Sequence, residues 1–285
     1  MANQEANYYP SGDIVLLNRG DGNTAIVHLH GATLLSWKCR GVEQLFLSST
    51  AVFDNKKAIR GGVPVVFPNF GPWPLGPQHG FARIKRWTSA VPPTKDHNGD
   101  VIALLVLQDD EETREMWNYK FRLVYTLTLT ATTLSGTLVV HNTDQKALGF
   151  TCLLHTYFRV ADIKTTAVTG LHDLVYSDKL KGGKEERESR KEVTINESND
   201  RVYKEAPKIV YITSGPEPAR QIELTTFNFP DIVIWNPWEK AKEMGDFDDE
   251  GYKEMICVEP GKVWTPITLE AGQQFECSQI LRSLL

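Results

Sequence analysis

Alternation of apolar and polar residues over residues 121–129 is the feature that most limits how this chain can fold. An apolar side chain stands at every odd position from Phe121 to Leu129. A period of two is typical of a strand with one face in the core and the other toward water. Gly136 follows, and residues 137–140 resume the apolar run, which predicts a turn at Gly136 within an antiparallel meander.

Similar short β-rich runs recur along the chain, with Gly, Pro, Asn and Asp between them. No alternation of strands with helices is visible, and the best helical candidate is residues 109–117, capped by Asp109 or Asp110. This spacing predicts an all-β fold, a large antiparallel β-sandwich with few short helices. Without an internal repeat or a linker-like segment, we expect one domain over residues 1–285. The further predicted runs are residues 24–29, 101–107, 209–212, 222–227, 232–235 and 274–281.

Three segments are expected to lie between strands. Residues 61–80 are rich in Pro and Gly and are long for a simple connection, and loops of that length are usually functional or disordered. Their three large aromatic side chains favour an ordered, packed loop. Residues 179–191 and 239–254 are highly charged, and we interpret both as solvated surface loops.

Charge and composition narrow the classes of function. The formal net charge of -5 opposes general nucleic-acid binding, because affinity for a phosphate backbone needs a clustered basic surface. The first residues lack the features of a secretion signal, and no run reaches the roughly 20 apolar residues of a membrane span, so we expect a cytoplasmic protein without membrane association. The 4 cysteines show no Cys-x-x-Cys spacing, which agrees with reduced, buried thiols.

Two histidines and one glutamate stand in distinctive short segments. His79 lies in QHGFAR, His155 in LHTYF and Glu259 in CVEPG. Two imidazoles and a carboxylate, if the fold brings them together, suit proton exchange on a neutral hydroxyl or ether oxygen near pH 7. No nucleotide-binding or hydrolase fingerprint is present. These residues predict an enzyme that needs no cofactor.

Three further segments stand in a fixed order with these: GATLLSW at residues 31–37, RGGVPVVFPNFG at residues 60–71 and DRVY at residues 200–203. Together the segments resemble the hexose-6-phosphate mutarotases, also called glucose-6-phosphate 1-epimerases, a branch of the aldose 1-epimerase superfamily. The resemblance covers residues 31–266. It implies a galactose mutarotase-like supersandwich that interconverts the α and β anomers of hexose 6-phosphates.

The resemblance implies an acid and a base. His155 would protonate the pyranose ring oxygen, and Glu259 would remove the proton of the anomeric hydroxyl. Taken alone, His155 among apolar neighbours is more typical of a core histidine, and Glu259 before Pro-Gly is equally compatible with a surface turn. We expect burial to raise the pKa of Glu259, and the carboxylates of Glu259 and Asp200 to raise the pKa of His155 above its usual value of about 6.5.

The resemblance also implies contacts to the sugar hydroxyls. His79 and Asp200 match family positions that hydrogen-bond them, although Asp200 alone would pass for a turn residue. Gln78 is expected to add a contact, because its amide both donates and accepts. Four aromatic residues either form an apolar wall for the sugar's C–H face or belong to the core: Trp73, Phe81, Tyr157 and Trp235.

Arg60 and Arg83 carry the argument for a phosphorylated substrate. A guanidinium offers paired donors that match phosphate geometry. Either arginine considered singly would be read as a solvated charge, but their places in two of the segments imply a shared site for the 6-phosphate. Lys85 and Arg86 alternate along an extended chain, so at most one of them should join it.

A metal site is not expected. His28 and His30 have the alternate spacing of a half-site on one strand face, but no further ligand cluster is attached to them. We therefore expect neither a metal ion nor another cofactor.

The sequence thus predicts an isomerase for hexose 6-phosphates, glucose 6-phosphate first among them, that acts as a monomer on this small-molecule partner. Two alternatives remain open. A carbohydrate-binding module would use the same pocket without turnover, and would need no matched acid and base. A mutarotase for neutral aldoses would have no use for Arg60 and Arg83.

Overall fold

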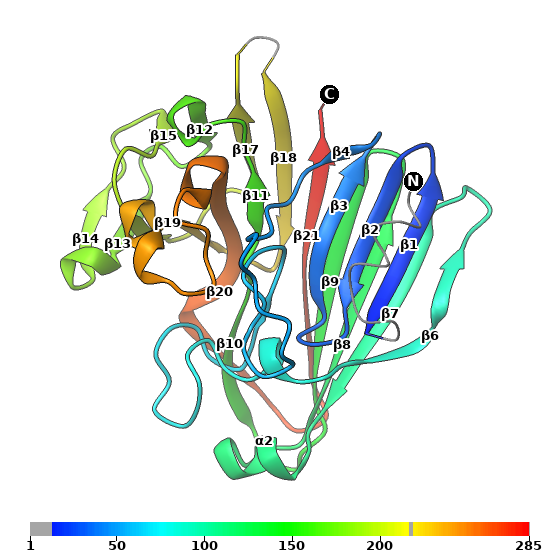
Figure 1. Ribbon diagram of the computed structural model, residues 1–285. Coiled ribbons are helices and arrows are strands. Elements are labelled where there is room, and N and C mark those ends of the chain that lie inside the picture. The colour runs from blue at the N-terminus through cyan, green and yellow to red at the C-terminus, as the bar shows by residue number, and fades with distance from the viewer. Residues whose placement is uncertain (1–12, 217–218, 285) are drawn as a thin grey trace.

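The computed structural model describes residues 13–216 and 219–284 and arranges them as three antiparallel sheets of four, eight and nine strands. In Figure 1 the nine-stranded sheet forms the rear layer, and the other two sheets stand side by side in front of it. Apolar side chains from all three sheets pack into one continuous core. The predicted all-β antiparallel sandwich is confirmed.

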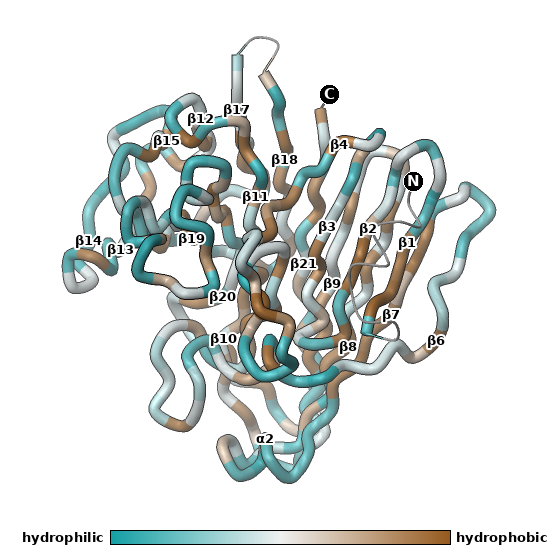
Figure 2. Tube along the Cα trace, in the orientation of Figure 1, coloured by the Kyte–Doolittle hydropathy of each residue, from teal (hydrophilic) through white to brown (hydrophobic). Residues whose placement is uncertain are grey.

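Regular alternation builds the nine-stranded sheet, whose order is β15-β12-β17-β18-β21-β9-β8-β7-β6. Every odd residue of β8 is buried and every even one is partly exposed, as the apolar pattern predicted. Figure 2 shows hydrophobic residues along the strands and hydrophilic ones in the outer loops. The strands are β6 (Thr88–Lys95), β7 (Val101–Gln108), β8 (Phe121–Leu129), β9 (Thr133–Asn142), β12 (Thr166–Thr169), β15 (Glu192–Thr194), β17 (Ile209–Ser214), β18 (Arg220–Phe227) and β21 (Gln274–Ser283).

The meander β7-β8-β9 is confirmed, but the turn predicted at Gly136 is wrong. Gly136 lies inside β9, paired with Leu127 on one side and Gln279 on the other. A Cβ atom at Gly136 would lie 2.6 Å from the hydroxyl of buried Tyr125. The glycine therefore makes room for a core side chain, and the chain reverses earlier, where Thr130 N donates to Thr133 O.

The front layer contains the two smaller sheets. The four-stranded sheet is β1 (Ile14–Gly20), β2 (Asn23–His28), β3 (Thr33–Cys39) and β4 (Val42–Glu43). The eight-stranded sheet has the order β14-β13-β16-β19-β20-β10-β5, with β11 paired to β20. Its strands are β5 (Val65–Val66), β10 (Leu148–Leu154), β11 (Tyr157–Arg159), β13 (Val175–Asp178), β14 (Lys184–Arg187), β16 (Asn199–Tyr203), β19 (Asp231–Asn236) and β20 (Met255–Leu269). Each run predicted from the sequence overlaps a strand of one of the three sheets.

Helical segments are short, as predicted. Helix α2 (Glu111–Met116) is capped by Asp110, whose side chain accepts a hydrogen bond from Thr113 N. The 3-10 turns are η2 (Ala82–Ile84), η3 (Ile163–Thr165), η4 (Lys179–Lys181), η5 (Trp238–Glu243) and η6 (Gly251–Glu254). No helix within residues 13–216 and 219–284 is long and apolar enough to cross a membrane.

The segment of residues 61–80 is an ordered, packed loop, as predicted. Its Phe67 is fully buried and contacts Phe81 and Phe150 in the core. The prediction of two solvated charged loops is wrong in part. Residues 179–191 contain η4, β14 and the buried Glu188, which binds Arg190 and Tyr203. Residues 239–254 contain most of η5 and all of η6, so both segments include regular secondary structure.

Candidate active site

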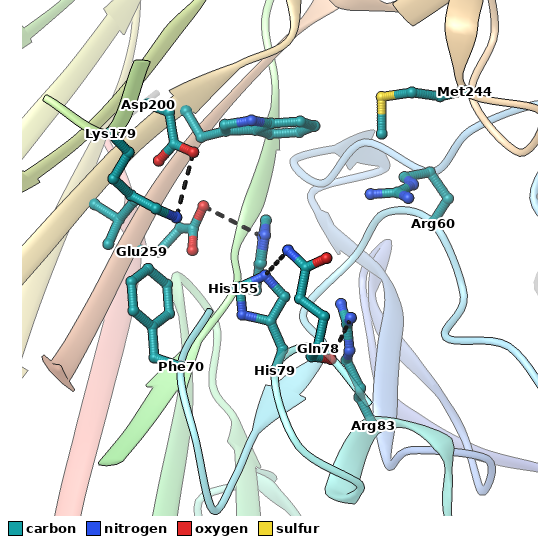
Figure 3. Close-up of a pocket in the computed structure, with 12 residues that line it drawn as sticks. Arg60, Phe70, Gln78, His79, Arg83, His155, Lys179, Asp200, Met244 and Glu259 are labelled. Carbon is teal, nitrogen blue, oxygen red and sulfur yellow. Dashed lines mark hydrogen bonds and ion pairs between the residues drawn. The ribbon is translucent and has the colours of Figure 1, made fainter. Parts of the chain in front are cut away.

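A cavity of about 180 Å³ opens on the eight-stranded sheet and contains all seven residues predicted for the site. Strands, a turn and a loop far apart in the sequence supply them (Figure 3). Polar and charged side chains dominate this cavity, with a smaller apolar part. It is lined by Arg60, Phe70, Gln78, His79, Arg83, His155, Lys179, Asp200, Val233, Trp235, Met244 and Glu259.

Neighbouring strands of the sheet place the acidic groups and the aromatic wall. Asp200 on β16 pairs in register with Trp235 on β19, and Val233 pairs with Glu259 on β20. Residues two apart on a strand share a face, so these side chains point to the same side. His155 follows β10 directly, and its backbone N–H donates to Pro64 O.

The loop of residues 61–80 places the second histidine through backbone contacts. His79 has a left-handed φ of 66°, and its N–H donates to Gly71 O at 2.9 Å. Gly71 N in turn donates to His79 Nδ1 at 3.1 Å, so the proton of the neutral ring lies on Nε2. The Gln78 side-chain amide lies 3.2 Å from Nε2 and can accept this proton only through its oxygen, with the amide group flipped. Gly80 is needed because a Cβ there would lie 2.2 Å from Phe67 O.

His155 and Glu259 face each other at the floor of the cavity. Their Nδ1 and Oε1 atoms are 3.4 Å apart, and both side chains are buried. His155 Nδ1 and both carboxylate oxygens of Glu259 lack a hydrogen-bond partner among the described residues. A buried polar atom without a partner costs about 1 to 3 kcal/mol, so the fold tolerates this pair at the expense of stability.

Burial shifts both groups toward their neutral forms. The pKa of Glu259 is raised well above its usual value, first by burial and then by the charge of Asp200, as expected. The pKa of His155 is lowered well below its usual value, first by burial and then by His79, Arg83 and Arg60. The expected rise of the His155 pKa is therefore wrong for this cavity, because desolvation and nearby cations outweigh the carboxylates.

The opposite side of the cavity carries the two arginines. Arg60 Nε lies 3.3 Å from Asp246 Oδ1, and Arg60 Nη1 donates to the Tyr157 hydroxyl at 3.2 Å. Arg83 Nη2 donates to Gln78 O at 2.8 Å, while Arg83 Nε is buried without a partner among the described residues. The two guanidiniums therefore lie in one site, held by neutral and acidic groups.

The structure adds residues that sequence reasoning missed. Lys179 Nζ lies 3.3 Å from Asp200 Oδ2 and 4.7 Å from the centre of the Phe70 ring. Met244 and Val233 complete the apolar part. No sequence signal pointed to Lys179, because it stands in a charged run that reads as surface.

The predicted aromatic wall is only partly formed by the expected residues. Trp235 lines the cavity. Phe81 is fully buried and Trp73 packs against the core, so neither forms the wall. Tyr157 is buried beneath the site and stacks on His155, with ring centres 4.7 Å apart.

Neither Lys85 nor Arg86 joins the arginine site. Lys85 pairs with Asp110 and Glu112, and Arg86 pairs with Asp13. Both residues are therefore paired with other carboxylates outside the cavity, which agrees with the expectation that at most one of them would join the site.

His28 and His30 each use one ring nitrogen in a backbone contact. His28 Nδ1 accepts from His30 N at 3.0 Å, and His30 Nε2 lies 2.8 Å from Lys57 O. The group of side chains with metal-ligand spacing within residues 13–216 and 219–284 is instead His155, Cys257 and Glu259.

Comparison with known proteins identifies the family. The aldose 1-epimerase family profile matches residues 13–282. A protein of Cenchrus ciliaris named "putative glucose-6-phosphate 1-epimerase" is 38% identical over 275 residues, covering 93% of this chain and 83% of its own. An Escherichia coli K12 protein of the same name is 37% identical, with 81% and 77% covered.

A solved structure agrees with these relatives. The crystal structure of a "putative mutarotase" from Salmonella typhimurium superposes with a TM-score of 0.86 at 31% identity, covering 95% of this chain and 90% of that one. Family profile, relatives and structure thus each match at least 81% of the chain. The chain therefore belongs to the aldose 1-epimerase family and is an isomerase.

Proposed function

We propose that this enzyme interconverts the α and β anomers of a hexose 6-phosphate, with glucose 6-phosphate as the first candidate, and uses no cofactor. One observation carries the proposal: the guanidiniums of Arg60 and Arg83 line the same cavity as the buried His155–Glu259 pair. A pair for proton exchange and two donors suited to phosphate are what an anomerase for a phosphorylated sugar needs. The names of the two relatives point to the same substrate.

The reaction needs one proton to leave the sugar and another to reach it. Glu259 removes the proton of the C1 hydroxyl while His155 donates a proton to the ring oxygen, and the C1–ring oxygen bond breaks. The open aldehyde rotates about C1–C2. The ring closes when His155 takes back the proton of the C5 hydroxyl and Glu259 returns a proton to the C1 oxygen, so the enzyme ends unchanged.

The pair works with one shared proton. In the empty cavity burial favours two neutral groups, because the pKa of Glu259 is raised and that of His155 is lowered. The forward step needs the ionised arrangement, with carboxylate and imidazolium. A bound phosphate dianion would offset the charges of Arg83 and Arg60, two causes of the lowered pKa of His155. Phosphate binding would thereby favour the working form of the acid.

The other lining residues would hold the sugar ring. His79 remains neutral, because burial lowers its pKa to about 3, and its Nε2–H can donate to a hydroxyl. Gln78 stands beside it, and Asp200 with Lys179 presents a charged pair on the other side. Trp235 and Phe70 offer apolar surface to the C–H face of the sugar.

Saturation-transfer NMR of α/β exchange tests the proposal. We expect the enzyme to accelerate exchange of glucose 6-phosphate strongly and that of glucose weakly, at equal concentrations. Faster exchange of glucose would assign the enzyme to neutral aldoses. Saturable binding of the phosphosugar with no acceleration of either exchange would make the pocket a binding module and end the enzymatic proposal.

A further inference from the structure

Cys257 shares a strand face with Glu259 and has no part in the proposed reaction. The two residues are two positions apart on β20, and Cys257 pairs in register with Trp235 on β19 and Tyr157 on β11. The side chain of Cys257 is fully buried. Its thiol therefore lies on the same side of the sheet as the Glu259 carboxyl group.

The spacing of the three side chains is that of metal ligands. One nitrogen, one sulfur and one carboxylate oxygen of His155, Cys257 and Glu259 all lie within 4.8 Å of one another. Zinc bonds of 2.0 to 2.3 Å in a tetrahedron put ligand atoms roughly 3.3 to 3.8 Å apart. The 3.4 Å between His155 Nδ1 and Glu259 Oε1 falls within that range, and Cys257 Sγ lies within 4.8 Å of the other two ligand atoms.

The ligand atoms are also available. His155 Nδ1 and both oxygens of Glu259 are buried without a hydrogen-bond partner among the described residues. An imidazole, a thiolate and a carboxylate form a mixed ligand set that suits zinc and similar thiophilic ions. The thiolate and the carboxylate together supply two negative charges, which balance a divalent ion next to Arg60 and Arg83.

We propose that His155, Cys257 and Glu259 form an inhibitory site for a thiophilic divalent cation, with zinc as the reference ion. The ion takes His155 Nδ1, Cys257 Sγ and a Glu259 oxygen as ligands, and the Cys257 thiol and the Glu259 carboxyl group each release a proton to solvent. A fourth position faces the cavity that His155 and Glu259 line. The bound ion occupies both groups of the proposed proton exchange, so it stops turnover and competes with the sugar. It is not a cofactor of the reaction.

Direct binding and inhibition are measured on the same protein. Zinc is titrated against a chromophoric chelator to give its dissociation constant, and α/β exchange is followed as zinc rises, with reversal by chelator. Cys257→Ala should keep its exchange activity without zinc. This variant should weaken both zinc affinity and zinc inhibition by at least roughly 10- to 100-fold. That is the loss of metal affinity seen when only a residue that supports a metal ligand is removed.

Cys277→Ala is the matched control. Cys277 is also fully buried, and its sulfur lies 3.9 Å from that of Cys152, so it tests the other thiol cluster. This variant should keep wild-type zinc inhibition. Equal zinc sensitivity of Cys257→Ala and wild type, or no zinc binding by the wild type, would overturn the proposal.

Cobalt(II) absorption gives a second readout that needs no activity and no stable Cys257 variant. The wild type and Cys277→Ala should both show thiolate-to-cobalt charge-transfer absorption. The band should disappear when zinc displaces the cobalt ion. Loss of this band in Cys277→Ala, or its absence from the wild type, would contradict the site. Because binding is read without substrate, failure of the hexose-phosphate proposal would leave this result intact.

Discussion

The two ends of the cavity differ in whether their ionisable groups have hydrogen-bond partners. At one end His155 and Glu259 are buried, and their facing atoms lack hydrogen bonds. At the other end Arg60 is bound by Asp246 and Tyr157, and Arg83 is bound by the carbonyl of Gln78. The His155–Glu259 end therefore carries a desolvation cost that no hydrogen bond offsets. The guanidinium groups at the other end already have some of their hydrogen-bond partners.

This difference predicts which kinetic parameter each end of the cavity affects in the proposed reaction. Unpaired, desolvated groups gain most when charge moves in the transition state, so the His155–Glu259 end should act on kcat. Arginines that grip a phosphate remote from C1 make nearly the same contacts before and during the reaction. That end should therefore act on KM. The following predictions test this division, from the largest effect to the smallest.

Removing either member of the pair should have the largest effect. We expect Glu259→Gln and His155→Asn each to lower kcat for anomer exchange by about 10²- to 10⁴-fold, because each removes a positioned acid or base. KM should change little. The double variant should lose little more than either single one, since the two proton transfers act together. Unchanged turnover in either single variant would rule out the assigned roles.

Loss of an arginine should come next and should appear in the other parameter. Arg83→Ala is expected to raise KM for glucose 6-phosphate by roughly ten- to a hundredfold, since a charge-assisted hydrogen bond contributes about 1.5 to 3 kcal/mol. Exchange of free glucose serves as the internal control and should be almost unaffected. Equal losses on both substrates would show that Arg83 supports the fold of the Gln78–His79 loop rather than the phosphate.

The alkaline limb of the pH profile should move in opposite directions in two variants. The active pair holds one proton, which is lost as pH rises through the raised pKa of Glu259, so kcat/KM falls there. Asp200 raises that pKa and Lys179 lowers it. Asp200→Asn should therefore shift the limb to lower pH, and Lys179→Met to higher pH.

Lys179→Arg is the matched control for this pair, because it keeps the positive charge and should keep the wild-type limb. Profiles are measured as kcat/KM from pH 5 to 9.5. Shifts of the same sign in Asp200→Asn and Lys179→Met would mean that these residues act through packing and not through their charges.

The smallest effect should be a gain in stability. Folding raises the pKa of Glu259 above 4.5, so the stability gained from its proton is complete below that pH and is lost as pH rises through the folded value. Each unit of this rise costs about 1.4 kcal/mol once the group ionises. Glu259→Gln should unfold at a higher temperature than wild type at pH 8, and the gap should close toward pH 4.5. A gap independent of pH would contradict burial of the charge as its cause.

Local pattern was sufficient for much of the architecture. The alternation in β8 reports which side of a strand is buried, and this depends on the residue types alone. The same reasoning failed at Gly136, because the glycine is needed by Tyr125 across the sheet and not by a turn. Why a strand needs glycine at one position can be seen only when the side chains of the neighbouring strands are placed.

The candidate site, like the fold, was predicted from the sequence only in part. Short segments with a family resemblance pointed to seven residues, and the fold brings all seven into one cavity. Lys179 and Met244 escaped notice because they reach the cavity from charged surface segments. The direction of the His155 pKa also escaped, since it depends on how deeply the ring is buried and on which cations surround it.

By itself the sequence determined the strand-rich fold, the family and the residue types available for proton exchange and phosphate binding, because these depend on local periodicity and on short motifs. Tertiary structure alone decided that His155 and Glu259 stand 3.4 Å apart without hydrogen bonds, and that a ligand atom of Cys257 lies within 4.8 Å of theirs. Distances, burial and long-range charge arise when strands from distant parts of the chain pair in register. No local pattern encodes those quantities.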